Sequence, residues 1–103
     1  MVIVLIRTKH RPDANLAAYE ALGAEMYALV QQIPGFIAAD EFKGDDGSLG
    51  VVRFETLDAL KVWREHPLHA PVMQRGRAEF YASYTIEVCE TVRVYTRETS
   101  VLA

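Results

Sequence analysis

The N-terminal segment, residues 2–8, constrains the fold of this chain most, because β-branched and aliphatic residues follow one another there without alternation. A strand with one face in water alternates apolar with polar residues, whereas a strand covered on both faces does not. We therefore predict a strand at the centre of its sheet, with both faces covered. Other segments of the chain must pair with it on either side.

A helix is predicted directly after this strand. Beyond Pro12, either Asp13 or Asn15 can cap its N-terminus, because a short polar side chain accepts hydrogen bonds from the first free amides. Apolar side chains then recur every three to four positions, which is the helical period. They are Leu16, Tyr19, Leu22, Met26, Leu29, Val30 and Ile33. The helix is expected to end at Pro34 and Gly35.

Two further strands are predicted over residues 36–43 and 48–55, separated by a short polar turn at residues 44–47. The turn ends in Asp46-Gly47, and an Asp-Gly pair supplies the positive φ that a tight hairpin turn demands. The two strands should therefore be antiparallel neighbours in the sheet.

The second half of the chain predicts two helical segments and a last strand. Thr56 can cap a helix to about Glu65, which Pro67 stops, and a second helical segment spans residues 70–81. In the long last strand, alternate apolar residues share one face: Tyr84, Ile86, Val88, Val92 and Val94. The order is βαββαβ, in one domain over residues 1–103 with a polar tail from about residue 98.

This order is typical of the ferredoxin-like α+β fold, a four-stranded antiparallel sheet with helices on one face. In a single copy the opposite face stays uncovered, although the first strand is apolar on both sides. Association with a second copy would remove that apolar surface from water. We therefore predict a homodimer, a dimeric α+β barrel joined through the sheet faces, with the last strand reaching across the partner's sheet edge.

Charge and composition exclude several classes of protein. The net charge of −3 argues against nucleic-acid binding, which needs a cationic face. The longest apolar run, residues 1–6, is too short to cross a membrane or to form a signal peptide. Cys89 is the only cysteine, which fits a cytoplasmic protein, and no glycine-rich segment precedes a helix as a nucleotide cofactor would require. No cofactor is predicted.

Polar and aromatic side chains concentrate between Trp63 and Tyr84, and we place the candidate site there. One of two imidazoles, His66 or His69, is expected to face a cleft beneath the helices, where a pKa near 6.5 suits a general base. A metal site would need a third ligand that the sequence does not assign. The residues predicted to contact a small aromatic or apolar ligand are Trp63, Arg77, Tyr81, Tyr27 and Arg53, with solvent or the dimer interface as the alternative surroundings of Arg53. Plain core packing is the alternative for Trp63.

Several segments resemble the antibiotic biosynthesis monooxygenase family, small dimeric α+β barrel proteins that include quinol monooxygenases and polyketide-tailoring oxygenases. The matching segments are residues 33–36, residues 54–60 with Trp63, His69, Gly76-Arg77, Phe80-Tyr81, Tyr84 and residues 92–95. The resemblance implies a cofactor-independent monooxygenase for a small aromatic or quinol-type substrate in a cleft between sheet and helices. It implies His69 as the base, His66 as the alternative base, and Arg77 and Tyr81 as stabilisers of an oxyanion.

The chain departs from the family at two places. Polyketide-tailoring members carry an Asn and then a Trp around the end of the third strand, where this chain has Arg53 and Leu57. Haem-degrading members carry an Asn in the first strand, and residues 4–8 contain none. Two other interpretations stay open: a non-catalytic dimeric module that binds a small ligand, and a haem or metal binder that uses His66 and His69.

Overall fold

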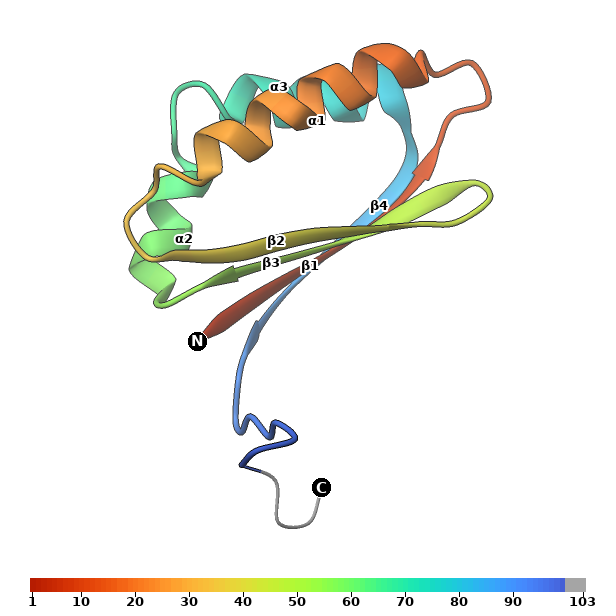
Figure 1. Ribbon diagram of the computed structural model, residues 1–103. Coiled ribbons are helices and arrows are strands. Elements are labelled where there is room, and N and C mark those ends of the chain that lie inside the picture. The colour runs from red at the N-terminus through yellow and green to blue at the C-terminus, as the bar shows by residue number, and fades with distance from the viewer. Residues whose placement is uncertain (100–103) are drawn as a thin grey trace.

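The computed structural model describes residues 1–99, which form a four-stranded antiparallel sheet with helices on one face (Figure 1). The elements, in chain order, are β1 (Val2–His10), α1 (Leu16–Val30), β2 (Phe36–Lys43), β3 (Gly47–Phe54), α2 (Leu57–Arg64), α3 (Ala70–Arg75), the π-helix η1 (Gly76–Phe80) and β4 (Tyr81–Glu90). The strand order is β2-β3-β1-β4. The predicted ferredoxin-like α+β fold is thereby confirmed. No helix in this part of the chain is long and apolar enough to span a membrane.

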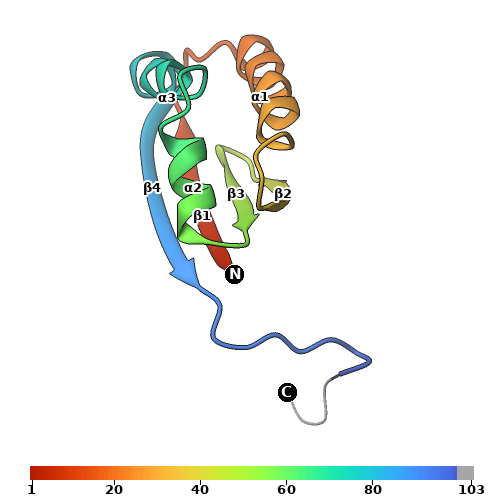
Figure 2. The ribbon, with the colours of Figure 1, turned by 90° about the vertical axis from the view of Figure 1, so that its left-hand side faces the viewer.

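Strand β1 lies at the centre of the sheet, as the sequence predicts. Val4, for example, is opposite Val52 of β3 on one side and Val88 of β4 on the other, and both pairings are antiparallel. In a single copy only one of the two faces is covered, as expected, and cover of the other face by a second copy stays a prediction. All the helices lie on one side of the sheet (Figure 2). The odd-numbered residues of β1, such as Leu5, therefore face away from the helices.

The core lies between the sheet and the helices, at the end of the sheet nearest α2. Its centre is Phe54, which is fully buried and contacts Phe36 edge to face at 6.1 Å between ring centroids. The buried members of this cluster are Val2, Val4, Val30, Ile33, Phe54, Ala59, Leu60 and Trp63. Apolar side chains from β1, β3, α1 and α2 thus hold both layers together.

The two helix caps form where the sequence places them. The side chain of Asn15 accepts from the Ala18 amide at 3.1 Å, and the Thr56 hydroxyl accepts from the Ala59 amide at 3.1 Å. Helix α1 ends at Val30, earlier than expected, because the amide of Ile33 already bonds to the Val30 carbonyl in a turn. Caps depend on neighbouring residues alone, which is why a sequence pattern identifies them.

The hairpin between β2 and β3 forms, but the reason given for Gly47 is wrong. Among residues 1–99, Gly35 alone has a positive φ, at 90°. Gly47 is needed for space instead, since a Cβ atom there would lie 1.9 Å from the carbonyl oxygen of Thr8. The constraint thus comes from the neighbouring strand and not from the turn.

The helical segment predicted over residues 70–81 is divided. Helix α3 ends at Arg75, a π-helical turn follows, and Tyr81 already belongs to β4. The widened turn brings the Tyr81 ring against Gly76, where a Cβ atom would lie 2.7 Å from the ring. An α-helical prediction misses this change because the contact joins two different elements.

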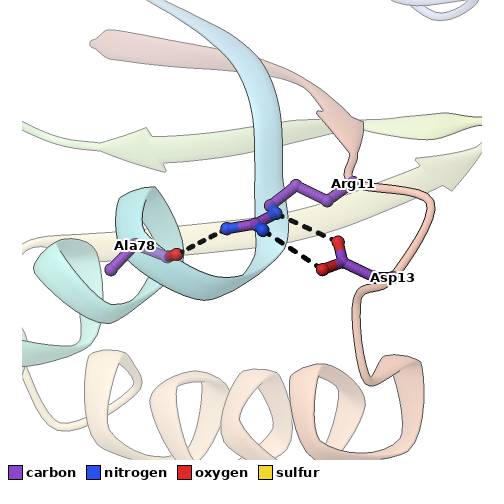
Figure 3. A network of polar contacts seen from close by, with 3 residues as sticks. All are labelled: Arg11, Asp13 and Ala78. Atoms are coloured by element: carbon purple, nitrogen blue, oxygen red, sulfur yellow. Dashed lines mark hydrogen bonds and ion pairs between the residues drawn. The ribbon is translucent and has the colours of Figure 1, made fainter.

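Arg11 ties the segment between β1 and α1 to the π-helical turn (Figure 3). Its guanidinium donates to the Ala78 carbonyl at 2.8 Å and to both carboxylate oxygens of Asp13 at 3.1 Å. The Arg11 amide also donates to the Phe80 carbonyl at 2.8 Å. These bonds fix the place at which β4 begins.

The last strand is shorter than expected. Strand β4 ends at Glu90, and residues 91–96 continue as an extended segment that leaves the body of the molecule (Figures 1 and 2). The apolar side chains of this segment are in water, with Val92 86% and Val94 61% exposed. Of the predicted polar tail, residues 100–103 lie outside the described residues.

Candidate functional site

A cavity of about 630 Å³ lies between the sheet and the helices. Its floor includes Val4 and Ile6 of β1 and Val52 of β3, and its roof includes Met26 of α1 and Met73 of α3. A volume of this size is typical of sites that take small organic molecules. Most of its wall is apolar, which strengthens each polar contact made against it.

His69 lines this cavity. Its Nδ1 lies 3.1 Å from the carbonyl oxygen of Trp63. Because a carbonyl only accepts hydrogen bonds, Nδ1 must carry the proton, and Nε2 of the neutral ring is then an acceptor. The imidazole also stacks on the Trp63 indole, with ring centroids 4.0 Å apart. The side chain is therefore held in one orientation and one tautomer.

Burial lowers the pKa of His69 below its ordinary value. The hydrogen bond to the Trp63 carbonyl raises this pKa, and the charge of the nearby His66 lowers it, but burial is the largest cause. The imidazole is consequently neutral at pH 7. A neutral imidazole in an apolar wall can accept a proton from a ligand.

His66, the second imidazole proposed from the sequence, does not line the cavity. Its Nδ1 accepts from the Leu68 amide at 3.1 Å, and its carbonyl oxygen accepts from the His69 amide at 3.0 Å. His66 thus closes the turn between α2 and α3 that sets the position of His69.

Trp63 fills both roles that the sequence leaves open. Its side chain is 8% exposed and belongs to the buried core cluster, and it also lines the cavity. Tyr27 of α1 lines the cavity from the opposite helix and is 48% exposed. Two aromatic rings are therefore available to contact a ligand in the cavity.

A second group of aromatic side chains lies where β4 begins. Tyr81, Tyr19 and Tyr84 all line the cavity, and the Tyr81 ring centroid is 5.9 Å from that of Tyr19 and 6.1 Å from that of Tyr84. Burial raises the pKa of Tyr81, and Tyr19 and Glu41 add to the rise. The Tyr81 phenol stays protonated and can donate a hydrogen bond.

His10 is a feature that the sequence analysis missed. Its ring lies 4.8 Å from the ring of Tyr19 and is stacked near Tyr81 at 6.4 Å between centroids. The Nε2 atom is buried and has no hydrogen-bond partner. Its position at the end of β1 gives no sequence signal, because the contact with Tyr81 depends on the pairing of β1 with β4.

Arg53, predicted to contact substrate, does not line the cavity. It lies opposite Ile3 of β1 and forms an ion pair with Asp40 of β2 at 3.6 Å. Its neighbour in β3, Val52, lines the cavity, so Arg53 faces the other side of the sheet. The carboxylate of Asp40 balances the mid-strand charge there.

Four charged residues along the cavity were not identified from the sequence: Glu20, Asp40, Glu41 and Lys43. Lys43 of β2 donates to Glu20 of α1 at 2.9 Å, and this bond raises the pKa of Lys43 and lowers that of Glu20. Arg77 also lines the cavity, and its guanidinium lies 5.6 Å from the ring centre of Tyr84. These residues come from separate elements, so no local motif joins them.

The arrangement of potential metal ligands bears on the interpretation of His66 and His69 as a metal site. Within residues 1–99, no group of three or more His, Cys, Asp or Glu side chains is placed to hold a metal ion. The Nδ1 atoms of His66 and His69 are both engaged by backbone groups.

Comparisons with known proteins identify the class of fold. No family model matches the sequence. A curated relative, the uncharacterized protein YqjZ of Bacillus subtilis (strain 168), is 29% identical over 80 residues, which are 77% of this chain and 70% of the relative.

Solved structures match over almost the whole chain. Rv0793 from Mycobacterium tuberculosis matches with a TM-score of 0.80 and 20% identity, over 92% of this chain and 98% of that one. SnoaB, a cofactor-independent oxygenase from Streptomyces nogalater, matches with a TM-score of 0.76 and 17% identity, over 90% and 94%. An antibiotic biosynthesis monooxygenase matches with a TM-score of 0.78 and 17% identity, over 90% and 100%. The resemblance to this family is therefore confirmed at the level of the fold.

Proposed function

We propose that this chain is a cofactor-independent monooxygenase that oxidises a small aromatic, quinol-type substrate in the cavity between sheet and helices. The observation that supports it most directly is His69, a neutral imidazole whose hydrogen bond to the Trp63 carbonyl leaves Nε2 as an acceptor in an apolar wall. The fold shared with SnoaB, described as a cofactor-independent oxygenase, supports the same class.

In this proposal the substrate is the reductant. Nε2 of His69 takes a phenolic proton, and the resulting electron-rich anion transfers electrons to dioxygen. In the balanced overall reaction, one oxygen atom enters a ring C–H bond of the quinol, and the second oxygen atom leaves as water with the two hydroxyl hydrogens, so that the product is a hydroxyquinone. The stacked rings of Trp63 and His69 contact the substrate and exclude water from the anion.

The experiment measures oxygen uptake with a panel of quinols and anthrone-like phenols. We expect uptake by the wild-type chain and a loss of about a hundredfold or more in His69→Ala, as is common for a general base. Glu65→Gln is the matched control, because Glu65 is exposed, lies beside the same turn and is outside the cavity lining. Equal rates in wild type and His69→Ala would remove His69 from the reaction, and no uptake by either would remove the oxygenase assignment for this panel.

A non-catalytic binding module is the second candidate, and the size and apolar wall of the cavity favour it. It differs from the first in one measurement. Native mass spectrometry would show a retained small molecule, while no compound of the panel would support oxygen uptake.

We further propose that two copies associate through the uncovered face of the sheet and through residues 91–96. The exposed apolar side chains of Val92 and Val94 support this, because an extended segment of this kind gains stability when it is covered. A cytoplasmic location stays a prediction from composition.

A further inference from the structure

The charged side chains that line the cavity are unevenly paired. Lys43 lies 2.9 Å from Glu20 and 3.9 Å from Glu41, so the carboxylates of α1 and β2 have a cation beside them. In contrast, Arg64 and Arg77 line the cavity and form no ion pair with any residue from 1 to 99. Two unpaired guanidinium groups beside an apolar cavity favour a ligand that carries negative charge.

Arg77 is the better positioned of the two cations. Its guanidinium lies over the ring of Tyr84, which itself lines the cavity from β4. Stacking on an aromatic face leaves the edge of the guanidinium free for the two oxygens of a carboxylate. The backbone beside Arg77 is fixed as well, because Arg11 holds the carbonyl of Ala78 at 2.8 Å (Figure 3).

Arg77 and His69 both line the cavity and are well separated along the backbone. Eight positions of continuous helical backbone separate them, which corresponds to about 12 Å along a helix axis. Figure 1 shows α3 running from the side of α2 toward the start of β4. The distance along strand β1 between the positions nearest to these two residues is similar.

On β1, Val4 belongs to the same buried cluster as Trp63, the residue on which His69 stacks, whereas Thr8 is opposite Tyr84. Four strand positions separate Val4 from Thr8, or about 13 Å. The two measures agree on a backbone separation of about 12–13 Å, which suits polar groups at the two ends of an elongated ligand.

We propose that the cavity takes an elongated aromatic carboxylate, with its carboxylate on Arg77 and, if the proposed oxygenase function holds, its ionisable hydroxyl at His69. The substrate class is then a hydroxyaryl carboxylate whose polar groups lie at its two ends. Binding of the carboxylate by Arg77 does not depend on whether the chain oxidises the ligand.

The experiment compares two fluorescent probes that share an aromatic framework. Anilinonaphthalene sulfonate carries an anionic group, and N-phenylnaphthylamine is its uncharged counterpart. The chain has one tryptophan, Trp63, so energy transfer from Trp63 to a bound probe measures binding, and the Arg77→Gln variant tests whether the probe lies beside Arg77.

For the wild-type chain we expect tighter binding of the anionic probe, and a loss of affinity as salt is added. Arg77→Gln should weaken the anionic probe about fivefold or more while the neutral probe changes by less than about twofold. Arg75→Gln is the matched control, because Arg75 precedes Arg77 by two positions but pairs with Glu79 and lies outside the cavity lining.

Three results would overturn the proposal: equal affinity of the wild-type chain for both probes, an Arg77→Gln effect of the same size on both probes, or a loss of anion affinity in Arg64→Gln instead of Arg77→Gln. None of these measurements involves oxygen. An absence of oxygen uptake with retained anion selectivity would therefore remove the monooxygenase function and leave the carboxylate site.

Discussion

The imidazole of His69 lies almost parallel to the indole of Trp63, 4.0 Å away, and its Nδ1 is 3.1 Å from the carbonyl oxygen of the same residue. One residue therefore supplies both the surface on which the imidazole rests and the acceptor that fixes its tautomer. A turn closed by His66 connects the two. Both contacts of the candidate base come from one segment of seven residues, 63–69.

The acid limb of the pH profile should reflect the burial of His69. Burial lowers the pKa of this imidazole below 6.5, and the base must be neutral to accept a proton. We therefore expect kcat/KM for oxygen uptake to fall only as the pH drops below 6.5, through the lowered pKa. The measurement is a pH series with a substrate that does not titrate in this range. An inflection above 6.5 would contradict this role.

The same pKa shift makes stability depend on pH. Below 6.5 the unfolded chain binds a proton at His69 more readily than the folded chain does. The free energy of unfolding should then decrease as the pH falls from 6.5 through the lower folded-state pKa. Urea unfolding at pH 7 and pH 5 should show a smaller decrease for His69→Gln than for the wild type. Identical pH dependence of both would show that burial of His69 carries no such cost.

Two glycines offer a matched test of the packing at Tyr81. A Cβ atom at Gly76 would lie 2.7 Å from the Tyr81 ring, whereas a Cβ atom at Gly23 of α1 would meet nothing within 4 Å. We expect Gly76→Ala to lower the free energy of unfolding by about 1–3 kcal/mol through overpacking. Gly23→Ala should raise it by about 0.5–1 kcal/mol, because alanine favours a helix. Chemical denaturation measures both, and equal effects would mean that the ring moves aside freely.

Association of two copies should depend on the uncovered face of the sheet. Leu5 faces away from the helices and lies opposite Glu87 of β4, so Leu5→Lys places a charge on that face beside a carboxylate. We expect light scattering after gel filtration to show a dimer for the wild type and a monomer of about 11.6 kDa for Leu5→Lys.

The control is Val62→Lys, which adds the same charge on α2, where Val62 is 53% exposed. It should remain a dimer. A monomeric wild type, or a dimer that survives Leu5→Lys with the fold intact, would count against association through this face.

The elements of the fold could be predicted because their signals are local. Asn15 and Thr56 cap helices through bonds to amides three residues away, so the sequence pattern contains both partners. The π-helical turn could not be predicted in the same way. It depends on Gly76 meeting Tyr81 and on Arg11 reaching Ala78 from another part of the chain.

The candidate site could be predicted only in part, for the same reason. Residue type and spacing point to the segment from Trp63 to Tyr84, but the roles of His66 and His69 depend on which backbone group each ring meets. Arg53 was misplaced because its face depends on strand pairing and on the alternation beside Val52. Glu20 and Lys43 were missed because they meet the cavity from two elements outside that segment, α1 and β2.

The two faces of strand β1 belong to two different surfaces, the cavity and the uncovered face of the sheet. Val4 and Ile6 line the cavity, while Leu5 between them faces outward from the helices. Over evolutionary time, substitutions at even-numbered positions can alter which molecules fit in the cavity while the outer surface keeps its shape. Substitutions at odd-numbered positions can alter the outer surface while the cavity keeps its shape. A mutational scan of this strand would accordingly separate into two interleaved series, one that changes ligand preference and one that changes self-association.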